Sequence, residues 1–441
     1  MPKIAIIGAG GYVFPLTLVR DILSFPELND TEFALMDIDA GSLARTASYA
    51  RRLVEAHHLP AKIVETTDRR AAVDGADVVI VTFQVGGLEA YRLDVEIPRK
   101  YGLDQTVGDT LGPGGVFRGL RSMAVLADLA ADMRELCPKA LLIQYANPMS
   151  MNCRLTADAG IKTVGLCHSV QGTSRMLAET IMGYEPGSWS YRCAGINHQA
   201  WFIEFTHQGR DVLADLRAKV NAYSKGGNEG ENASDDLYGG GREQVRIAIM
   251  NLTGYFQTES SHHASEYLPY FRRSKEEVAR WVPNRWDYYE ICVNHDFEHE
   301  RARVEELTTK PLAASEEYGA YIVHSMVTGI PRVIYGNVQN TGLITNLPDG
   351  CCVEVACLVD KQGIQPTYVG DLPAACAGVN MGSIAMQQCA VRGSQTGDRE
   401  LVHAAVALDK LTSALLDLPT CRRMVDEMFE AQAAWLPQFN A

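Results

Sequence analysis

The N-terminus carries the feature that most restricts how this chain can fold. The apolar run Lys3–Ile7 is typical of a buried parallel strand, and a glycine-rich turn and a helix-like segment from about Phe14 to Ser24 follow it. This order is the context of a dinucleotide-binding turn, because glycines let the backbone approach a pyrophosphate and the helix N-terminus offers free N–H groups. Val13 stands where that fingerprint has its third glycine. The predicted cofactor contacts in the turn are Gly8, Gly10 and Gly11.

A second apolar run, Glu32–Met36, leads into two acidic residues, Asp37 and Asp39. In this type of fold, an acidic residue at the tip of the second strand binds the ribose 2′-OH and favours NAD over its 2′-phosphorylated form. Asp37 is the first candidate for this contact and Asp39 is the second. The alternative is that the carboxylate caps the N-terminus of the next helix.

Apolar runs continue to alternate with helical patterns up to about residue 188. The runs are Ala76–Thr82, Ala140–Tyr145 and Lys162–Gly165, and Ser122–Cys137 has the pattern of an amphipathic helix. This alternation predicts an α/β fold with a Rossmann-type doubly wound parallel sheet over residues 1–188. Because ligands bind at the carboxyl ends of parallel strands, we expect Gln84, in the loop after the first of these runs, to contact the cofactor.

The rest of the chain has a different pattern. Val333–Val338 and Cys352–Val359 are typical of strands in an antiparallel layer, and the stretch from about Val379 to Trp435 is helical in pattern. Tyr223–Glu243 is rich in Gly, Asn, Ser and acidic residues, which predicts a mobile surface insertion. We therefore predict a second, α+β domain over residues 189–441 for substrate binding and oligomerisation.

Charge and cysteine content restrict the partners and the compartment. The formal net charge of -14 and the isoelectric point of about 5.3 argue against nucleic acid or an anionic membrane as the main partner. No apolar run reaches the ~18 residues of a membrane helix, and the start runs into a strand without a signal peptide. We expect a cytoplasmic protein with reduced thiols. Cys351, Cys352 and Cys357 are predicted to pack in strands rather than to bind zinc.

Two short motifs place polar side chains near the expected cofactor. Glycine and proline are dense over Gly108–Arg118, which predicts a defined loop rather than a helix. Its charged members, Asp109 and Arg118, are candidate substrate ligands, and the alternative is a helix-capping aspartate and a solvated arginine. At Asn147-Pro148, the proline ends a strand and restricts the asparagine backbone at the edge of the sheet.

A cysteine and a histidine further along the chain can hold one divalent metal. Cys167 follows the run Lys162–Gly165, and His198 lies in the next segment. Thiolate and imidazole suit a first-row metal and leave positions open for water or a substrate oxygen; this chemistry alone favours Zn²⁺ or Fe²⁺. The alternatives are a buried cysteine that acts as a small hydrophobic residue and a histidine satisfied within the core.

Taken together, the motifs resemble those of glycoside hydrolase family 4, in the order in which that family carries them. The similarity continues through Tyr335–Asn337 and Cys351–Gln365, so it covers nearly the whole chain. The resemblance implies a Rossmann-type domain, tightly held NAD⁺, a divalent metal that is usually Mn²⁺, and a homodimer or homotetramer. The motifs that carry it are Gly8–Gly10, Gly108–Gly115, Asn147-Pro148, Cys167–Ser169 and Gly195–His198.

The resemblance also implies a reaction outside the two-carboxylate scheme of most glycosidases. NAD⁺ takes a hydride from C3 of the sugar, and the resulting ketone acidifies the proton on C2. A base removes that proton while the metal polarises the C3 and C2 oxygens, and the glycosidic oxygen leaves C1 with help from a general acid. Water then adds and NADH returns the hydride, so there is no net redox change.

The family pattern transfers to individual residues of this sequence. Cys167 and His198 match its metal ligands, and Asn147 matches its substrate-binding asparagine. His168 takes the position at which members that act on phosphorylated sugars carry an aspartate, which implies an unphosphorylated substrate. His168 is therefore a candidate general acid, and Asp109 is the other candidate for proton transfer.

The base that acts on C2 is less well defined by the resemblance. Some members use a tyrosine in the region that corresponds to residues 255–267. Such a tyrosine needs a pKa well below its usual ~10, which a nearby metal could supply. The candidates are Tyr255, Glu259 and Tyr267.

The expected function is that of an NAD⁺- and metal-dependent α-glycosidase. α-Galactosides such as melibiose are the first expected substrates, and α-glucosides or α-galacturonides are alternatives within the family. A second hypothesis, an NAD-dependent dehydrogenase of malate or lactate type, predicts stoichiometric NADH and leaves Cys167 and His198 unexplained. A third, a sugar-responsive NAD-binding regulator, predicts binding without turnover.

Overall fold

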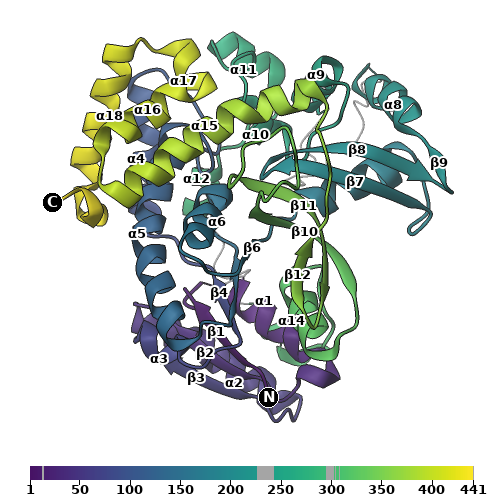
Figure 1. The fold of residues 1–441 in the computed structure, drawn as a ribbon, viewed down its shortest axis with the longest axis vertical. Helices are drawn as coiled ribbons and strands as arrows, with labels where there is room; N and C mark the ends of the chain where they lie inside the picture. The colour runs from purple at the N-terminus through teal and green to yellow at the C-terminus, as the bar shows by residue number, and fades with distance from the viewer. Residues whose placement is uncertain (12–13, 226–242, 295–301, 303, 307, 441) are drawn as a thin grey trace.

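The first part of the chain forms the predicted parallel sheet. The computed structural model describes residues 1–11, 14–225, 243–294, 302, 304–306 and 308–440, and its first six strands lie parallel in the order β3-β2-β1-β4-β5-β6. They are β1 (Lys3–Ile7), β2 (Glu32–Met36), β3 (Lys62–Thr66), β4 (Val78–Val81), β5 (Leu141–Gln144) and β6 (Thr163–Gly165). The expectation of a Rossmann-type α/β fold is confirmed (Figure 1).

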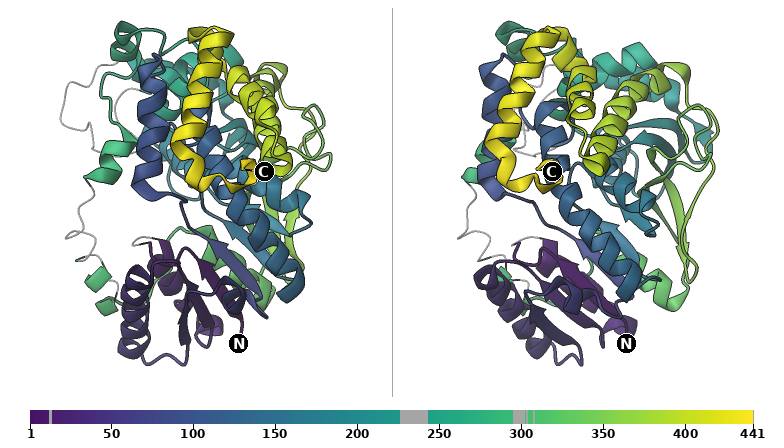
Figure 2. Two further views of the ribbon diagram at one scale, coloured as in Figure 1. Left: turned by 90° about the vertical axis from the view of Figure 1, so that its left-hand side faces the viewer. Right: turned by 60° about the vertical axis from the view of Figure 1, so that its left-hand side comes forward.

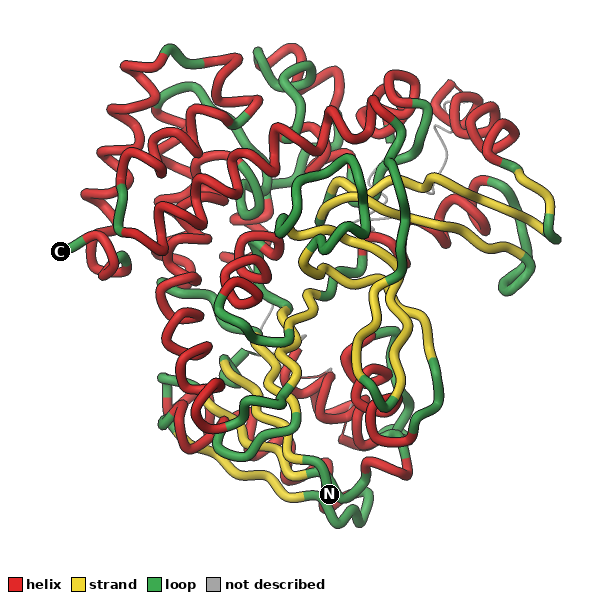
Figure 3. Tube along the Cα trace, in the orientation of Figure 1, coloured by secondary structure: helices red, strands yellow, loops and turns green. Residues whose placement is uncertain are grey.

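The antiparallel strands of the second part extend this same sheet. β6 pairs with β10 through Gly165 and Asn337, and the order continues with β11, β7, β8 and β9. The described residues thus contain one 12-stranded sheet, which runs through the molecule in Figure 3. Its further strands are β7 (Trp189–Ile196), β8 (Gln199–His207), β9 (Arg210–Asp211), β10 (Arg332–Gln339), β11 (Cys352–Asp360) and β12 (Gly363–Pro366). The domain boundary after residue 188 stays a prediction.

Helices cover the sheet, and the helices from the C-terminal end of the chain gather beside it. Figure 2 shows the last helices standing next to α4 and α5, away from the N-terminal strands, and α15 and α18 contact these two helices. The longer helices are α1 (Phe14–Leu23), α2 (Ala40–Ala56), α4 (Gly87–Lys100), α5 (Gly112–Leu136), α6 (Met149–Asp158), α8 (Leu213–Lys225), α9 (Gln244–Thr253), α14 (Tyr318–Thr328), α15 (Ala374–Thr396), α16 (Arg399–Leu408) and α18 (Leu418–Gln432). Shorter ones are α3 (Arg69–Val73), α7 (Ser169–Arg175), α10 (Ser261–Glu266), α11 (Lys275–Trp281), α12 (Tyr288–Val293) and α17 (Lys410–Leu415). Residues 226–242 of the predicted insertion lie outside the described residues.

The predicted loop over Gly108–Arg118 is wrong in its second half, because helix α5 begins at Gly112. Proline is tolerated in the first turn of a helix, where its missing N–H has no partner in any case, and Pro113 lies there. The glycines serve close packing: a Cβ on Gly114 would lie 2.5 Å from the carbonyl oxygen of Gly108. Tertiary contact, rather than local propensity, therefore decides the structure of this segment.

Both faces of the parallel sheet are buried, which explains its continuous apolar runs. On β1, Ile4 and Ile6 belong to one core cluster, while Ala5 and Ile7 belong to the cluster on the other face. None of the cysteines forms a disulfide, and those predicted to pack in strands are buried: Cys351, Cys352 and Cys357. Within the described ranges, no helix combines the length and the apolar character needed to cross a membrane.

Candidate active site

The carboxyl ends of the parallel strands and the antiparallel layer meet around one cavity of about 490 Å³. The residues after β4, β5 and β6 line it in turn, as expected for ligand sites in α/β sheets. Among the predicted site residues, those that line it are Gln84, Asp109, Arg118, Asn147, Cys167, His168, His198 and Glu259. Its aromatic and other lining includes Phe14, Phe83, Tyr145, His263, Trp286, Tyr288 and Ile291. The volume suits a sugar-sized ligand.

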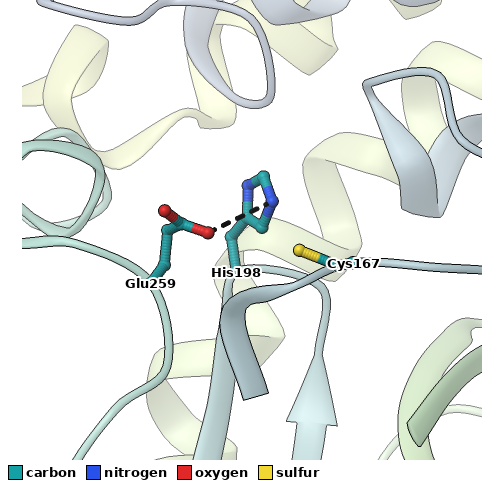
Figure 4. A group of neighbouring side chains, drawn as sticks. All are labelled: Cys167, His198 and Glu259. Atoms are coloured by element: carbon teal, nitrogen blue, oxygen red, sulfur yellow. Dashed lines mark ion pairs between the residues drawn. The ribbon is translucent and has the colours of Figure 1, made fainter. Parts of the chain in front are cut away.

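Three potential metal ligands converge on this cavity. The donor atoms of Cys167, His198 and Glu259 all lie within 4.8 Å of one another, and His198 Nε2 is 3.5 Å from Glu259 Oε2. Figure 4 shows the thiol and the carboxylate pointing toward the imidazole from two sides. Thiolate, imidazole and carboxylate are a donor set that suits a divalent first-row metal. Glu259, predicted from the sequence as a candidate base and not as a ligand, thus lies among the potential metal ligands.

The sheet explains why these three residues meet. Cys167 lies two residues beyond Gly165, where the parallel and antiparallel halves pair, and His198 lies in the turn between β7 and β8. The segment before Glu259 pairs with β8, because Thr258 N donates to Ala200 O at 2.9 Å. This pairing carries Glu259 alongside the β7–β8 turn.

Two of the three residues have a backbone conformation that side chains rarely adopt. His198 has φ +63° and Glu259 has φ +71°, both in the left-handed region. Such conformations cost about 1–3 kcal/mol and persist where the surrounding structure fixes them, frequently at functional sites. The surrounding structure therefore fixes both residues in a conformation that is common at functional sites.

Hydroxyl groups fix the second nitrogen of His198. Its Nδ1 lies 3.1 Å from Thr110 Oγ1 and 3.3 Å from Tyr267 Oη, so Nε2 is the atom left to face Glu259. A partner on the other ring nitrogen is the usual support of a metal-binding histidine. Tyr267 Oη also lies 2.9 Å from His263 Nδ1, so this hydroxyl contacts both imidazoles.

Burial and neighbouring charge set the protonation of the ligands. Burial, and then the carboxylates of Glu259 and Glu354, raise the pKa of the Cys167 thiol well above its ordinary value. Burial also raises the pKa of Glu259, but the imidazoles of His263 and His198 outweigh it and leave that pKa lowered. The carboxylate is therefore ionised, and a metal must displace the proton of the thiol in order to bind it.

A set of polar side chains joined by hydrogen bonds forms another part of the cavity wall. Asp109 Oδ2 accepts from Asn147 Nδ2 at 3.0 Å, and Arg118 Nη2 donates to Gln84 Oε1 at 2.9 Å. Burial raises the pKa of Asp109, but the charges of Arg118 and of two imidazoles outweigh it and leave the pKa lowered. Asp109 and Arg118 are 4% and 9% exposed, and the cap of α5 is Leu111, so the capping and solvation alternatives are wrong.

His168 has a partner that the sequence did not reveal. Its Nε2 lies 2.6 Å from Glu317 Oε1, and its ring stacks on Phe14 with centroids 6.1 Å apart. Burial lowers the pKa of His168, but the Glu317 carboxylate outweighs it and raises the pKa above the ordinary value. Because 149 residues separate this pair, no local pattern could have identified Glu317.

The glycine turn has the geometry expected of a close backbone approach. Gly8 has φ +93°, and a Cβ there would lie 2.6 Å from Phe83 N. Asp37 Oδ2 accepts from Gly10 N at 2.8 Å. Asp39 caps helix α2 through Gly41 N and Ser42 N, so the capping interpretation applies to Asp39 and not to Asp37. Glycine at position 8 therefore lets the turn pack closely against the backbone that follows β4.

The two candidate tyrosine bases do not line the cavity. Tyr267 is 2% exposed, and burial and the charges of Glu259 and Asp109 raise its pKa well above 10. Tyr255 packs, partly buried, against the hydrophobic core. Tyr145 and Tyr288 do line the cavity, although no sequence motif distinguished them.

The fold and the cavity together define an α/β protein of Rossmann type with a site built for catalysis. Residues 3–183 match the family 4 glycosyl hydrolase domain and residues 193–412 match the family 4 glycosyl hydrolase C-terminal domain. The chain belongs to glycoside hydrolase family 4, and it is a glycosidase. The family assignment confirms the resemblance and removes the dehydrogenase and regulator hypotheses.

Individual relatives are similar over the whole chain. An α-galactosidase of Rhizobium meliloti is 41% identical over 99% of this chain and 89% of its own length. An α-galactosidase of Bacillus subtilis is 37% identical, and the match covers 100% of both chains. Among solved structures, a 6-phospho-alpha-glucosidase from gut microorganisms in complex with NAD and Mn²⁺ has a TM-score of 0.81, at 18% identity over 99% of each chain. The last likeness is one of fold.

Proposed function

We propose that this glycosidase is an α-galactosidase that requires NAD⁺ and a divalent metal, Mn²⁺ first. The observation that carries the proposal is the convergence of Cys167, His198 and Glu259 with Asp109 and His168 on one cavity, at the carboxyl edge of a Rossmann-type sheet. The two α-galactosidases at 41% and 37% identity support the choice of sugar. The 6-phospho-alpha-glucosidase bound to NAD and Mn²⁺ supports the choice of cofactors.

The charge of the cavity supports an unphosphorylated, neutral sugar. Arg118 is the one lysine or arginine among the described residues that line it, and Asp109 and Glu259 are ionised there. A phosphate group commonly binds to clustered arginines or lysines. Here it would meet two carboxylates, a single guanidinium and the imidazoles of His168, His198 and His263. This balance agrees with the histidine that stands at position 168.

The residues present fit both groups that the family implies. Cys167, His198 and Glu259 would hold the metal, while the turn at Gly8, Gly10 and Gly11, with Asp37 and Gln84, would hold NAD⁺. When bound, NAD⁺ supplies a hydride acceptor for C3 of the sugar and the metal supplies a Lewis acid for its oxygens. Asn147 and Arg118 would bind sugar hydroxyl groups, because both have N–H groups at the cavity wall.

The chain's own residues would move the protons. His168 would give a proton to the glycosidic oxygen, and Glu317 would hold that imidazole in its protonated form. Asp109 would receive the proton from C2, since it is ionised and lines the cavity whereas Tyr255 and Tyr267 do not. Glu259, the remaining candidate base, faces the other two metal ligands.

The test is hydrolysis of para-nitrophenyl α-galactoside, α-glucoside and α-galacturonide, with and without NAD⁺ and Mn²⁺, under reducing conditions. We expect the galactoside to be preferred, both additions to be required, and no NADH to accumulate. Activity that persists without NAD⁺ after its complete removal would refute the mechanism. Preference for the glucoside or the galacturonide would move the chain to another branch of the family. Light scattering and fractionation would test the proposed homo-oligomer and its cytoplasmic location.

A further inference from the structure

The loop that leads into Asp109 is held by a carboxylate to which the proposed mechanism assigns no role. This carboxylate belongs to Glu266, the last residue of α10, which is 2% exposed. Its Oε1 accepts from Thr106 N at 2.6 Å and from Val107 N at 2.7 Å, and its Oε2 accepts from Gly108 N at 3.0 Å. The three backbone N–H groups that precede Asp109 therefore meet on one side chain.

Two side chains of the same loop complete the set of donors around Glu266. Thr106 Oγ1 donates to Oε1 at 2.9 Å, and Gln105 Nε2 donates to Oε2 at 3.0 Å. All five contacts come from donors, as an ionised carboxylate requires, and none of these donors carries a charge. Burying a charge is costly unless hydrogen bonds replace those that water would make. The loop supplies the hydrogen bonds that keep this buried charge stable.

The backbone of the loop has a shape that suits an anion. Gly108 has φ +60°, in the left-handed region, and successive N–H groups around such a residue form a concave site for negative charge. The carbonyl groups of the loop have other partners; Tyr91 Oη, for example, donates to Val107 O at 2.6 Å. Without the carboxylate, the three N–H groups would be buried and unpaired, which is rare in folded proteins. The position of the loop therefore depends on Glu266.

The two residues that follow this loop both belong to the site. Asp109 Oδ2 accepts from Asn147 Nδ2, and its Oδ1 accepts from Thr110 Oγ1 at 2.7 Å. Because that hydroxyl donates to the carboxylate, its oxygen is left to accept from His198 Nδ1–H, 3.1 Å away. This arrangement puts the lone pair of the imidazole on Nε2, the atom that faces Glu259. One loop thus places a proton-transfer group and sets the tautomer of a potential metal ligand.

We propose that Glu266 is a positioning residue: by holding the backbone of residues 106–108, it fixes both the Asp109 carboxylate and the support that Thr110 gives to His198. This inference rests on the proposed function, in which Asp109 receives the C2 proton and His198 binds the metal. Glu266 does not line the cavity, so its effect on a substrate is indirect. A misplacement of about 1 Å in a catalytic group can still cost about 100-fold in rate.

The test is Glu266→Gln, which keeps the size of the side chain but replaces one accepting oxygen with an NH₂ group that faces N–H donors. In the holoenzyme, kcat for para-nitrophenyl α-galactoside should fall about 100-fold, with a much smaller change in KM. Removal of the C2 proton should slow relative to the other steps, so the kinetic isotope effect of a substrate with deuterium at C2 should rise. Mn²⁺ affinity, measured by calorimetry, should fall about 10-fold, because the support of His198 is disturbed.

Asp132→Asn is the matched control, because it makes the same carboxylate-to-amide change at an acid that is 6% exposed and does not line the cavity. Asp132 accepts from Arg69 and Arg70, each at 2.7 Å, so this variant should lose stability but keep the wild-type isotope effect and Mn²⁺ affinity. A loss of folded protein lowers the apparent kcat but leaves an isotope effect unchanged, which separates positioning from general destabilisation. If Glu266→Gln does not fold, Glu266→Asp, which keeps the charge on a shorter side chain, should show the same changes at smaller size.

An isotope effect and an Mn²⁺ affinity that both stay at their wild-type values in a folded Glu266 variant would overturn the inference. A change in only one of them would overturn it as well, because a single loop carries Asp109 and Thr110. Wild-type protein that hydrolyses no galactoside, or hydrolyses it without NAD⁺, would refute the proposed function instead. The Mn²⁺ affinity of the folded variant would then decide the inference alone: a loss supports it, and an unchanged value refutes it. Wild-type protein that binds no Mn²⁺ refutes both.

Discussion

At the scale of single residues, burial and neighbouring charge have opposite effects on the pKa values of the carboxyl groups in the site. Burial alone would raise the pKa of all three acids, the buried Asp109 and Glu259 and the partly buried Cys167. Neighbouring cationic side chains reverse that effect at the two carboxyl groups, whereas the charge of Glu259 adds to it at the thiol. The thiol therefore keeps its proton until a cation takes its place.

Metal affinity should consequently depend on pH. Because the raised pKa of Cys167 keeps the thiol protonated in the metal-free protein, each bound Mn²⁺ releases one proton from it, so the apparent affinity should rise about 10-fold per pH unit. Calorimetry of the metal-free protein in several reducing buffers measures this slope. Cys167→Ser should bind more weakly and lose the slope, because a serine hydroxyl stays neutral. A flat pH profile in the wild type would remove the thiol from the ligand set.

Glu259 should contribute to metal binding and Glu317 should not, although both are glutamates near the same cavity. Glu259→Gln removes one anionic ligand and should weaken Mn²⁺ binding about 10- to 100-fold. Glu317→Gln makes the same chemical change at the carboxylate that faces His168, and should leave Mn²⁺ affinity as in the wild type. Equal Mn²⁺ affinities for the two variants would return Glu259 to the list of candidate bases.

Glu317→Gln should instead affect the proton given to the leaving group. The Glu317 carboxylate raises the pKa of His168, so the acid stays protonated to a higher pH, and activity is lost as pH rises through that pKa. In the variant this loss should begin at a lower pH. Melibiose, which has a poor leaving group, should lose more activity than the para-nitrophenyl galactoside, which needs little acid help. Identical losses would show that His168 is not the acid.

Local motifs in the sequence were enough to predict residues that share one cavity, and the roles of these residues stay predictions. Cys167, His198 and Asn147 stand in motifs that end strands, and all three line the cavity. The position of Glu259 beside Cys167 and His198 depends on pairing between its segment and β8, and the position of Glu317 depends on a contact across 149 residues. Neither position can be recognised from the local sequence.

At the scale of elements, the N-terminal strand, turn and helix followed from pattern alone. The apolar run gave β1 with the residues expected, and the two aspartates after β2 proved to have separate tasks. Helix α5 shows where such reasoning fails. Its first turn contains Gly112, Pro113 and Gly114, a composition typical of loops, and only packing against the Gly108 backbone makes it helical.

The two aspartates allow a crossed experiment. Asp37→Ala should weaken NAD⁺ binding about 10-fold or more, because it removes the carboxylate that holds Gly10 N and stands where the ribose is expected. Asp39→Ala removes a helix cap and should cost about 0.5–2 kcal/mol of stability with a smaller effect on NAD⁺. Titration with NAD⁺ and thermal unfolding separate the two effects. The opposite result would assign the ribose contact to Asp39.

At the scale of the whole molecule, one sheet joins the parts that the sequence suggested were separate domains. β10 and β11, from late in the chain, lie between β6 and β7, which follow each other in sequence. Strand order of this kind is set by long-range pairing, so it could not be predicted from local patterns. Its consequence is that the three potential metal ligands come from both sides of the junction between the parallel and antiparallel strands.

A metal at this junction should therefore stabilise the fold as a whole. Mn²⁺ at about 100 times its dissociation constant should add about 2.7 kcal/mol to the free energy of unfolding, if the unfolded chain does not bind it. Thermal unfolding with Mn²⁺ or with a chelator measures the effect as a rise or fall in Tm. Cys167→Ser and Glu259→Gln should show a smaller Mn²⁺-dependent rise at the same concentration but keep the rise caused by NAD⁺, because the glycine turn is intact in both. A variant with both substitutions that still gains the full Mn²⁺ shift would place the metal elsewhere in the molecule.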